Sequence, residues 1–267
     1  MIQQSELGLL DGFERALIND RLRLVYQPKI NLSDGSLKRV EALVRWDDPE
    51  MGSVPPSRFV PLAERHGLID EMTRWGLATA FRQCREWRDH GLECELAFNI
   101  SALSLKALAF PDLVEDYCAK YDMPTSMLVL ELTESATQPL VTLMDTLTRF
   151  RIKGIGLAID DFGTGYSTLM QLRQLPFTEI KIDRFFVADA CTNKDSRVIV
   201  ETIIELAHKL GLSATAEGIE TDEQLLLMRA LECDVAQGYR VAKPLPGDRL
   251  GDWIERWRAG WSDLVSG

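Results

Sequence analysis

The stretch LVYQPKINLSDGSLKRVEALVRW, residues 24–46, decides how the chain begins to fold. It contains two runs rich in β-forming residues, 24–30 and 37–46, and only a few residues separate them. The connection includes Ser-Asp-Gly-Ser at positions 33–36, which is typical of a hairpin turn and too short for a helical crossover. We therefore expect the chain to open with two antiparallel strands.

Repeated strand–helix units follow this hairpin. Further short apolar runs occupy residues 94–100, 127–132, 156–160, 179–183, 212–216 and 235–241. Helical patterns separate most of them, including one that Gly211 stops and one that opens with a capping box at Thr221 and Gln224. The pattern favours an α/β fold, a modified TIM-like (β/α)8 barrel with an antiparallel opening strand, over an open doubly wound sheet. A chain of 267 residues suits one such domain, with residues 1–20 as an N-terminal helix leading into a barrel domain at 21–267.

Composition excludes several classes of function. With 30 basic and 41 acidic residues, the net charge is −11, so no basic surface is expected for a DNA or RNA duplex. The five cysteines show no zinc-site spacing, which indicates reduced thiols in a cytoplasmic protein. We find neither a signal-peptide pattern nor an apolar run long enough to insert into a membrane.

Most of the predicted strands end in polar residues. Active sites of β/α barrels lie at the ends of the strands, and the barrel interior is expected to be apolar. These residues are Glu41, Arg45, Asn99, Glu131, Asp160, Asp161, Lys181, Asp183, Glu217 and Gln237. Lys181 and Asp183 are two residues apart and so share one face of their strand. Asp160 and Asp161 can reach a common site only if their strand breaks there, and the following Phe-Gly-Thr-Gly supplies the break.

Carboxylates that converge at one rim repel one another, and only Lys181 and Arg45 are expected to neutralise them. Salt bridges at the rim would explain any one of these residues alone, but they explain the whole set poorly. Oxygen ligands without Cys or His suit Mg²⁺ or Mn²⁺. Two adjacent aspartates suggest one bridging carboxylate and two metal ions, which in phosphoryl transfer lie roughly 3.5–4 Å apart. The residues thus indicate metal-assisted phosphoester hydrolysis.

A series of motifs in a fixed order makes the assignment specific. They are YQPKI (26–30), EAL (41–43), FNIS (98–101), ELTES (131–135), DDFGTGYS (160–167), KID (181–183), AEGIE (216–220), QGY (237–239) and KPLP (243–246). Each string is short, but their order and spacing make a chance match negligible. Over roughly residues 24–250 the chain resembles the EAL-domain cyclic di-GMP phosphodiesterases.

The resemblance implies metal-dependent hydrolysis of cyclic di-GMP to linear pGpG in bacterial second-messenger signalling, with two divalent cations, Mg²⁺ or Mn²⁺, as cofactors. The ligands that it implies for the first ion are Glu41, Asn99, Glu131 and Asp160. Asp160 would also bridge to the second ion, which Asp161 and Glu217 would hold. Lys181 would orient the attacking water and steady the charge on the phosphate. Glu217 is also the family's candidate general base, and the sequence does not separate its two roles.

The resemblance also implies the substrate contacts, which are Gln27, Arg45, Asp183 and Gln237. A guanidinium at Arg45 suits a phosphate oxygen, although Arg45 could instead pair with Asp47 or Asp48. Gln27 and Gln237 could equally be hydrogen-bonding residues at the ends of strands.

The segment 161–167 resembles a mobile loop that places the second metal aspartate, and Glu134 matches a catalytic residue that tethers this loop. The resemblance implies a homodimer formed through the region after the DDFGTG motif. One alternative is a catalytically silent receptor for cyclic di-GMP or a protein-interaction module, but all the residues usually lost in such proteins are present. A second alternative, an unrelated metal-dependent lyase barrel, does not explain the DDFGTG and QGY motifs.

Overall fold

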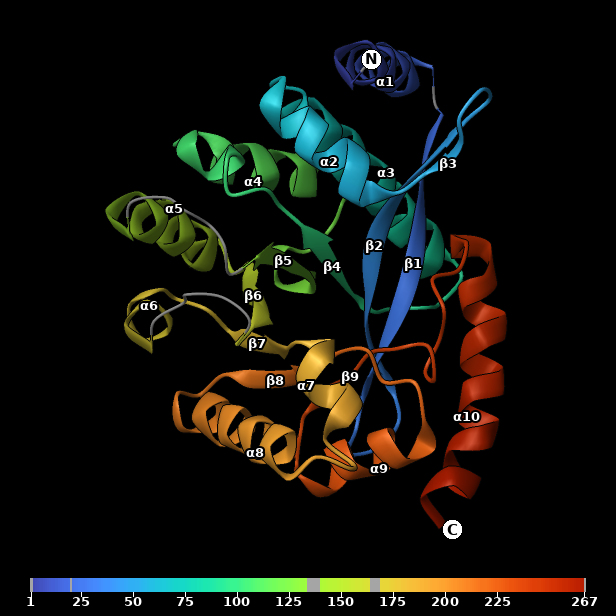
Figure 1. The fold of residues 1–267 in the computed structure, drawn as a ribbon, viewed down its shortest axis with the longest axis vertical. Helices are drawn as coiled ribbons and strands as arrows, with labels where there is room; N and C mark the ends of the chain where they lie inside the picture. Colours follow the sequence, from blue (N-terminus) through green and yellow to red (C-terminus); the bar gives the residue numbers. More distant parts are fainter. Residues whose placement is uncertain (1, 20, 134–139, 164–168, 267) are drawn as a thin grey trace.

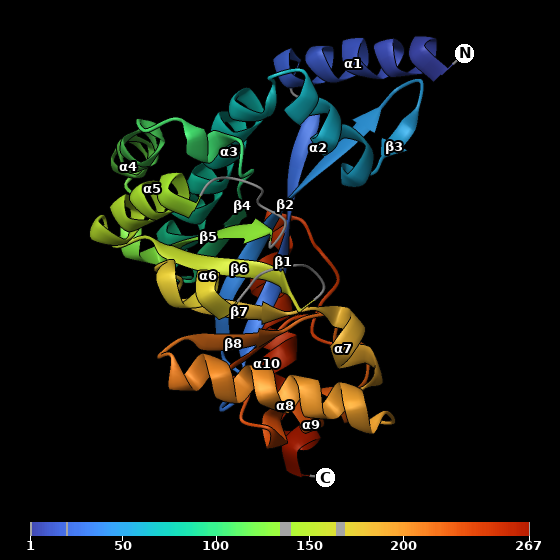
Figure 2. The ribbon, with the colours of Figure 1, turned by 60° about the vertical axis from the view of Figure 1, so that its left-hand side comes forward.

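The computed structural model describes residues 2–19, 21–133, 140–163 and 169–266, and within these ranges eight strands close into a barrel with helices packed around it (Figures 1 and 2). The barrel strands are β1 (Leu22–Asn31), β2 (Leu37–Asp48), β4 (Glu95–Asn99), β5 (Leu128–Thr133), β6 (Gly156–Phe162), β7 (Glu179–Ile182), β8 (Ser213–Ala216) and β9 (Val235–Ala236). The predicted modified barrel is confirmed, and the open doubly wound sheet is excluded.

The opening hairpin closes the barrel. Strand β1 pairs antiparallel with β2, with Gln27 opposite Glu41, and antiparallel with β9 on its other side. Pairings between β2 and β4 and from β4 through to β9 are parallel, as the strand–helix repeats predict. In the turn, Gly35 adopts a φ of 73°, which glycine tolerates without strain. A short strand, β3 (Gly52–Val54), pairs with the far end of β2.

Helices cover the outside of the barrel. They are α1 (Ile2–Ile18), α2 (Pro56–Arg65), α3 (Ile69–Asp89), α4 (Phe110–Lys120), α5 (Leu140–Ile152), α6 (Leu169–Gln174), α7 (Arg184–Asp189), α8 (Lys194–Lys209), α9 (Asp222–Ala230) and α10 (Leu250–Ser266). Helix α1 lies at one end of the molecule, where Phe13 packs against Trp46 and Phe59 in a second apolar cluster (Figure 1). Among the described helices, we find none long and apolar enough to cross a membrane.

The barrel interior is ionic, so the expectation of an apolar interior is wrong. Arg39 on β2 forms an ion pair with Glu179 on β7, and Lys29 on β1 forms one with Glu131 on β5. Neither pair of strands is adjacent in the sheet, so both contacts cross the barrel. The apolar residues of the same strands alternate with these groups and face outward, where Ile180 and others pack in the main core beneath the helices. The main apolar core therefore surrounds a charged centre.

Strand β9 is shorter than the predicted run 235–241. It ends at Ala236, and the chain then turns against the segment around Ile219. The amide of Ile219 donates to the carbonyl of Gln237 at 3.0 Å, and the amide of Arg240 donates to the carbonyl of Ile219 at 2.9 Å. A Cβ atom at Gly238 would lie 2.1 Å from the oxygen and 2.2 Å from the nitrogen of Ile219. Only glycine allows this approach, which places Gln237 at the barrel end.

The substitution Gly238→Ala tests this close approach. Because the new methyl group would collide with backbone atoms, we expect a loss of about 2–3 kcal/mol in the free energy of unfolding. Urea denaturation of the purified variant measures the loss. The matched control is Gly260→Ala in α10, where no atom lies within 4 Å of the added Cβ and a small gain is expected. Equal stability of the two variants would contradict the packing described at Gly238.

Candidate active site

Glu41 lies near the middle of β2 and points into the barrel, where two amides hold it. Asn99 Nδ2 donates to one carboxylate oxygen at 2.7 Å, and Gln237 Nε2 donates to the other at 2.7 Å. Burial alone raises the pKa of Glu41, but Lys181, Lys29 and these two hydrogen bonds outweigh it and hold the pKa well below its usual range. Glu41 is therefore an ionised carboxylate with a fixed orientation.

Glu131, at the end of β5, lies between two buried lysines. Lys181 Nζ is 2.6 Å from one of its oxygens, and Lys29 Nζ contacts the other. Burial and the nearby Glu41 raise the pKa of Glu131, and the two ammonium groups oppose that rise. Lys29 also lies 3.5 Å from Glu41, so a single ammonium joins the carboxylates of β2 and β5.

Lys181 connects this inner pair to the mouth of the barrel. Its Nζ lies 2.8 Å from Asp160 on β6 and 2.8 Å from Glu217, which directly follows β8. Although burial lowers the pKa of a lysine, the surrounding carboxylates raise the pKa of Lys181 well above its usual value. Lys181 is therefore charged at any physiological pH.

Asp160 and Asp161 reach the same site because their strand is irregular. The register between β6 and β7 shifts between Ile159 and Phe162, and Asp161 has a φ of 54°, in the left-handed region. This conformation costs backbone energy for a non-glycine residue and is characteristic of functional sites. One oxygen each of Asp160, Asp161 and Glu217 lies within 4.8 Å of the others, which could hold a metal ion. The strand is irregular at the aspartates and ends at Phe162, and Gly163 beyond it has a φ of 102°, so the part of the predicted break that the structure describes is present.

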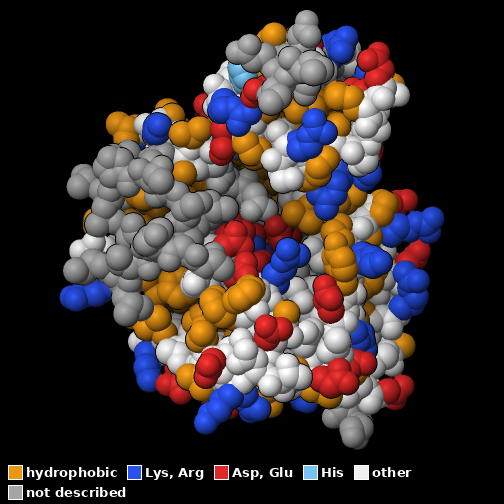
Figure 3. Space-filling view, in the orientation of Figure 1, with side chains coloured by type: hydrophobic (Ala, Val, Ile, Leu, Met, Phe, Trp, Pro, Cys, Tyr) orange, Lys and Arg blue, Asp and Glu red, His pale blue; other side chains and the backbone are white. Residues whose placement is uncertain are grey.

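Two further carboxyl groups at the mouth have raised pKa values. Burial, the neighbouring Asp160 and Asp183 raise the pKa of Asp161 to about 6. Burial raises the pKa of Glu217 to about 8, with Asp160 adding to the rise and Lys181 opposing it. Figure 3 shows acidic side chains gathered at the centre of this face of the molecule. Without a cation beyond the lysines, Glu217 thus holds a proton at neutral pH, and Asp161 is mostly ionised.

Lys29 is the site residue that the sequence analysis missed. Only Lys181 and Arg45 were expected to neutralise the carboxylates, but Lys29 is fully buried against Glu131, whereas Arg45 Nη1 donates to the carbonyl of Val44 at 2.8 Å. The signal was present in the alternation of β1, because Lys29 is two residues from Gln27 and shares its inward face.

Of the remaining predicted site residues, Gln27 and Asp183 each form hydrogen bonds with different neighbours. Gln27 accepts from Gln237 Nε2 at 3.1 Å and donates to the carbonyl of Ala242 at 3.0 Å. Asp183 caps the N-terminus of α7 by accepting from the amide of Phe185 at 2.7 Å, and it also raises the pKa of Asp161. Glu134 lies outside the described residues. The predicted roles of these residues in binding remain predictions.

Comparison with known proteins settles the family. The model of the EAL domain matches residues 11–244. This chain belongs to the EAL-domain family.

Similar EAL-domain proteins are longer than this chain. The oxygen sensor protein DosP of Escherichia coli is 41% identical over 253 residues, which cover 94% of this chain and 32% of DosP. A cyclic di-GMP phosphodiesterase of Pseudomonas aeruginosa is 38% identical over 256 residues, which cover 95% of this chain and 44% of the relative. The chain thus spans less than half the length of these curated relatives.

Solved EAL-domain structures share the fold closely. The complex of the PaMucR phosphodiesterase with c-di-GMP superposes with a TM-score of 0.86 at 38% identity, covering 91% of this chain and 99% of that one. The EAL enzyme Bd1971, in its form with cAMP and cyclic di-GMP bound, gives a TM-score of 0.90 at 31% identity, covering 95% of this chain and 70% of that one. These matches extend over the whole barrel.

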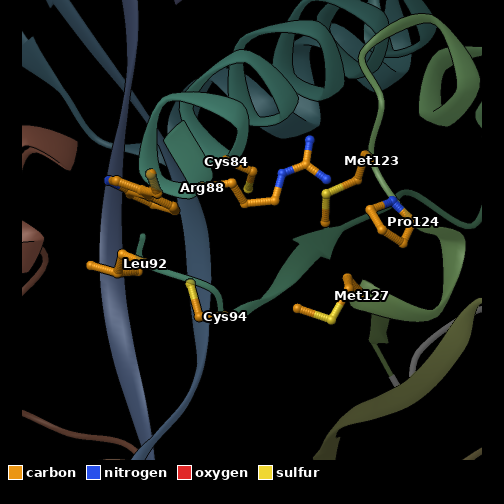
Figure 4. Close-up of a pocket in the computed structure, with 8 residues that line it drawn as sticks. Cys84, Arg88, Leu92, Cys94, Met123, Pro124 and Met127 are labelled. Atoms are coloured by element: carbon orange, nitrogen blue, oxygen red, sulfur yellow. The ribbon is translucent and has the colours of Figure 1, made fainter. Parts of the chain in front are cut away.

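A cavity on the outside of this EAL domain is too small to compete as a substrate site. It lies beside α3 and is lined by residues that include Cys84, Arg88, Cys94 and Met127 (Figure 4). The volume open to the centre of a water-sized sphere is about 10 Å³, enough for about one water molecule. The carboxylates that gather around Lys181 make the barrel mouth the candidate active site.

The raised pKa of Glu217 predicts how the metal-free protein responds to pH. The folded state keeps a proton on Glu217 up to about pH 8, whereas an ordinary glutamate releases it near 4.5, so folding becomes less favourable as pH rises between these values. We expect urea denaturation in a chelator to show stability falling from pH 5 to 8, and falling less steeply for Glu217→Gln. Identical slopes for the two proteins would contradict the assignment.

Proposed function

We propose that this chain hydrolyses cyclic di-GMP to linear pGpG with two bound divalent cations, Mg²⁺ or Mn²⁺, and acts in bacterial second-messenger signalling. The observation that carries the proposal is the set of five carboxylates at one end of the barrel, opposed by two lysines. The five are Glu41, Glu131, Asp160, Asp161 and Glu217. Family membership, and relatives named as cyclic di-GMP phosphodiesterases, support the choice of substrate.

The donor chemistry of the site fits hard divalent cations. Its ligating atoms are carboxylate and amide oxygens, which Mg²⁺ and Mn²⁺ prefer. Counting five carboxylates against Lys29 and Lys181 leaves a net charge of about −3, which two dications would slightly overcompensate. Burial and the neighbouring Asp160 raise the pKa values of Asp161 and Glu217, and a bound cation would lower both.

The proposed ligand sets are those that the family resemblance implies. Glu41, Asn99, Glu131 and Asp160 would hold the first ion, and Asp160 would be shared with a second ion on Asp161 and Glu217. Bound ions of this kind lower the pKa of a water held between them and stabilise charge on the phosphate oxygens. Asn99 already donates to Glu41, so binding the first ion requires the Asn99 side chain to turn its oxygen inward.

The residues of the chain supply positioning and charge. Lys181 contacts Glu131, Asp160 and Glu217 together, and from this position its ammonium can orient a water and donate to a phosphate oxygen. Glu217 is the candidate general base that the family resemblance implies, and a bound cation would lower its pKa and favour the deprotonated form that accepts a proton. It can serve as metal ligand or as general base, and each role requires it deprotonated.

Activity measured on purified protein tests this proposal directly. We expect cyclic di-GMP to be converted to pGpG with Mg²⁺ or Mn²⁺ and not with a chelator, and we expect Glu41→Gln to lower kcat/KM by at least about a hundredfold. Chromatographic separation of the products is the measurement. Tight binding of cyclic di-GMP without turnover would instead support the silent receptor. Neither binding nor turnover would contradict both functions.

Arg45 is the proposed phosphate contact of the substrate. It lies on the inward face of β2, four residues beyond Glu41 and thus about 13 Å along the strand. Partial burial and the opposing Arg23 lower the pKa of Arg45, whereas Arg23 itself pairs with Asp47 at 2.8 Å. A bound phosphate would relieve the repulsion that Arg45 experiences.

The substitution Arg45→Ala should therefore act on binding. We expect KM to rise about tenfold while kcat changes less than about threefold, since the contact holds ground and transition states alike. Steady-state kinetics with Arg23→Ala as the matched control, which should change KM less than about twofold, measure the effect. A fall in kcat as large as the fall in kcat/KM would show that Arg45 acts in the chemical step.

Two wider assignments remain predictions. A homodimer through the region after the DDFGTG motif would involve the residues from 166 onward, of which 166–168 lie outside the described part of the chain, and sedimentation of the purified protein would test it. The cytoplasmic location is likewise a prediction.

A further inference from the structure

Lys29 holds a position that the proposed chemistry does not use. It lies on β1 with its side chain 0% exposed, and its Nζ contacts Glu131 and lies 3.5 Å from Glu41. Both carboxylates belong to the proposed first metal site. Lys29 approaches them from within the barrel, and burial on all sides prevents its ammonium from turning away to solvent.

Lys29 and Lys181 contact different sets of carboxylates at the proposed first metal site. Lys29 and Gln237 contact one oxygen of Glu41, and Asn99 contacts the other. Lys29 contacts one oxygen of Glu131, and Lys181 contacts the other. Lys181 also reaches Asp160 and Glu217, which are partly exposed at the mouth, so a cation that enters meets Lys181 at the open side. Lys29 stays on the closed side.

We propose that Lys29 is a positioning residue that acts as a fixed counter-ion of the first metal site, so that the site folds without metal and binds divalent cations less tightly. The inference rests on the proposed function, because it needs a divalent cation at Glu41 and Glu131. The counter-ion role would explain why a fully buried lysine lies behind the proposed metal ligands, although its ammonium repels a bound cation.

Lys29 has two opposing effects on metal binding, and the larger one decides whether it strengthens or weakens the affinity. Its contacts hold Glu41 and Glu131 in place, which favours binding, but Asn99, Gln237 and Lys181 contact the same carboxylates and would still orient them. Its charge repels a dication that binds the same two groups in an interior with little water, where screening is weak. Repulsion therefore dominates over orientation.

Substitution of Lys29 by neutral and charged residues tests this inference in the full chain. In Lys29→Met and Lys29→Gln, we expect the metal-free protein to melt at a lower temperature and to bind Mn²⁺ at least about tenfold more tightly than the wild type. Lys29→Arg keeps the charge and should stay within about threefold of the wild type. Titration with Mn²⁺ while free Mn²⁺ is followed by electron paramagnetic resonance, at pH 8.5, measures the affinity without turnover.

Arg39 supplies the matched control. It too is a buried cation between two carboxylates, Glu95 and Glu179, but these begin β4 and β7 and are not among the proposed metal ligands. Arg39→Met should lower the melting temperature of the metal-free protein while its Mn²⁺ affinity changes less than about threefold. An equal gain of affinity in both variants would mean that general loosening, and not the charge of Lys29, changes the site.

Each outcome of the titration bears on the inference. Unchanged or weaker Mn²⁺ binding by both neutral variants overturns it and leaves the proposed function intact, whereas a wild type that binds no Mn²⁺ removes the metal site and both proposals with it. A neutral variant that folds only when Mn²⁺ is added supports the inference, because the ion then replaces the ammonium. Neutral variants that stay unfolded at saturating Mn²⁺ contradict it.

Discussion

The ion pairs of Glu131 with two lysines are the constraint on which the rest of the site depends. A carboxylate with 1% of its surface exposed is costly to ionise unless cations surround it. Lys29 and Lys181 meet this need from two sides, one behind the site and one at its mouth. Because breaking a buried pair by removing one partner is destabilising by about 3–5 kcal/mol, each charge in this group fixes the others.

The antiparallel start of the barrel follows from the same constraint. Strand β1 runs against β2, so the inward residues Gln27 and Lys29 lie opposite Glu41 and Arg39. A parallel β1 would begin at the other end of the barrel and bring its residues to the mouth in the reverse order. The hairpin thus places an ammonium and an amide beside Glu41 through strand register alone, with no loop involved. Rigid strands hold groups of this kind more precisely than loops.

Much of the fold and site followed from the sequence, and the failures share a physical cause. The strand periods, the hairpin turn and the motifs gave the barrel, and the residues placed at strand ends do meet at one end of it. The prediction of an apolar interior was wrong because alternation shows which residues share a face of a strand. It does not show whether that face points toward the helices or toward the barrel axis. Lys29 was missed for this reason, since the alternation of β1 gives its face but not its partner Glu131, which lies across the barrel on β5.

The break at Asp160 and Asp161 marks the other limit of the sequence. A left-handed residue is expected at glycine, and Gly163 does have a φ of 102°, but Asp161 also has a positive φ, of 54°. Local propensity disfavours this choice, so tertiary contacts must impose it. The result brings one oxygen each of Asp160, Asp161 and Glu217 within 4.8 Å of the others, and burial together with the charge of Asp160 raises the pKa values of Asp161 and Glu217. Strain in the backbone and repulsion between carboxylates are stored in the same few residues, and a cation bound among them would relieve the repulsion. The inner and outer ligands therefore differ in what binding would change, because Glu41 and Glu131 each lie close to Lys29 and are buried, whereas Asp160 and Glu217 share Lys181 and are partly exposed at the mouth.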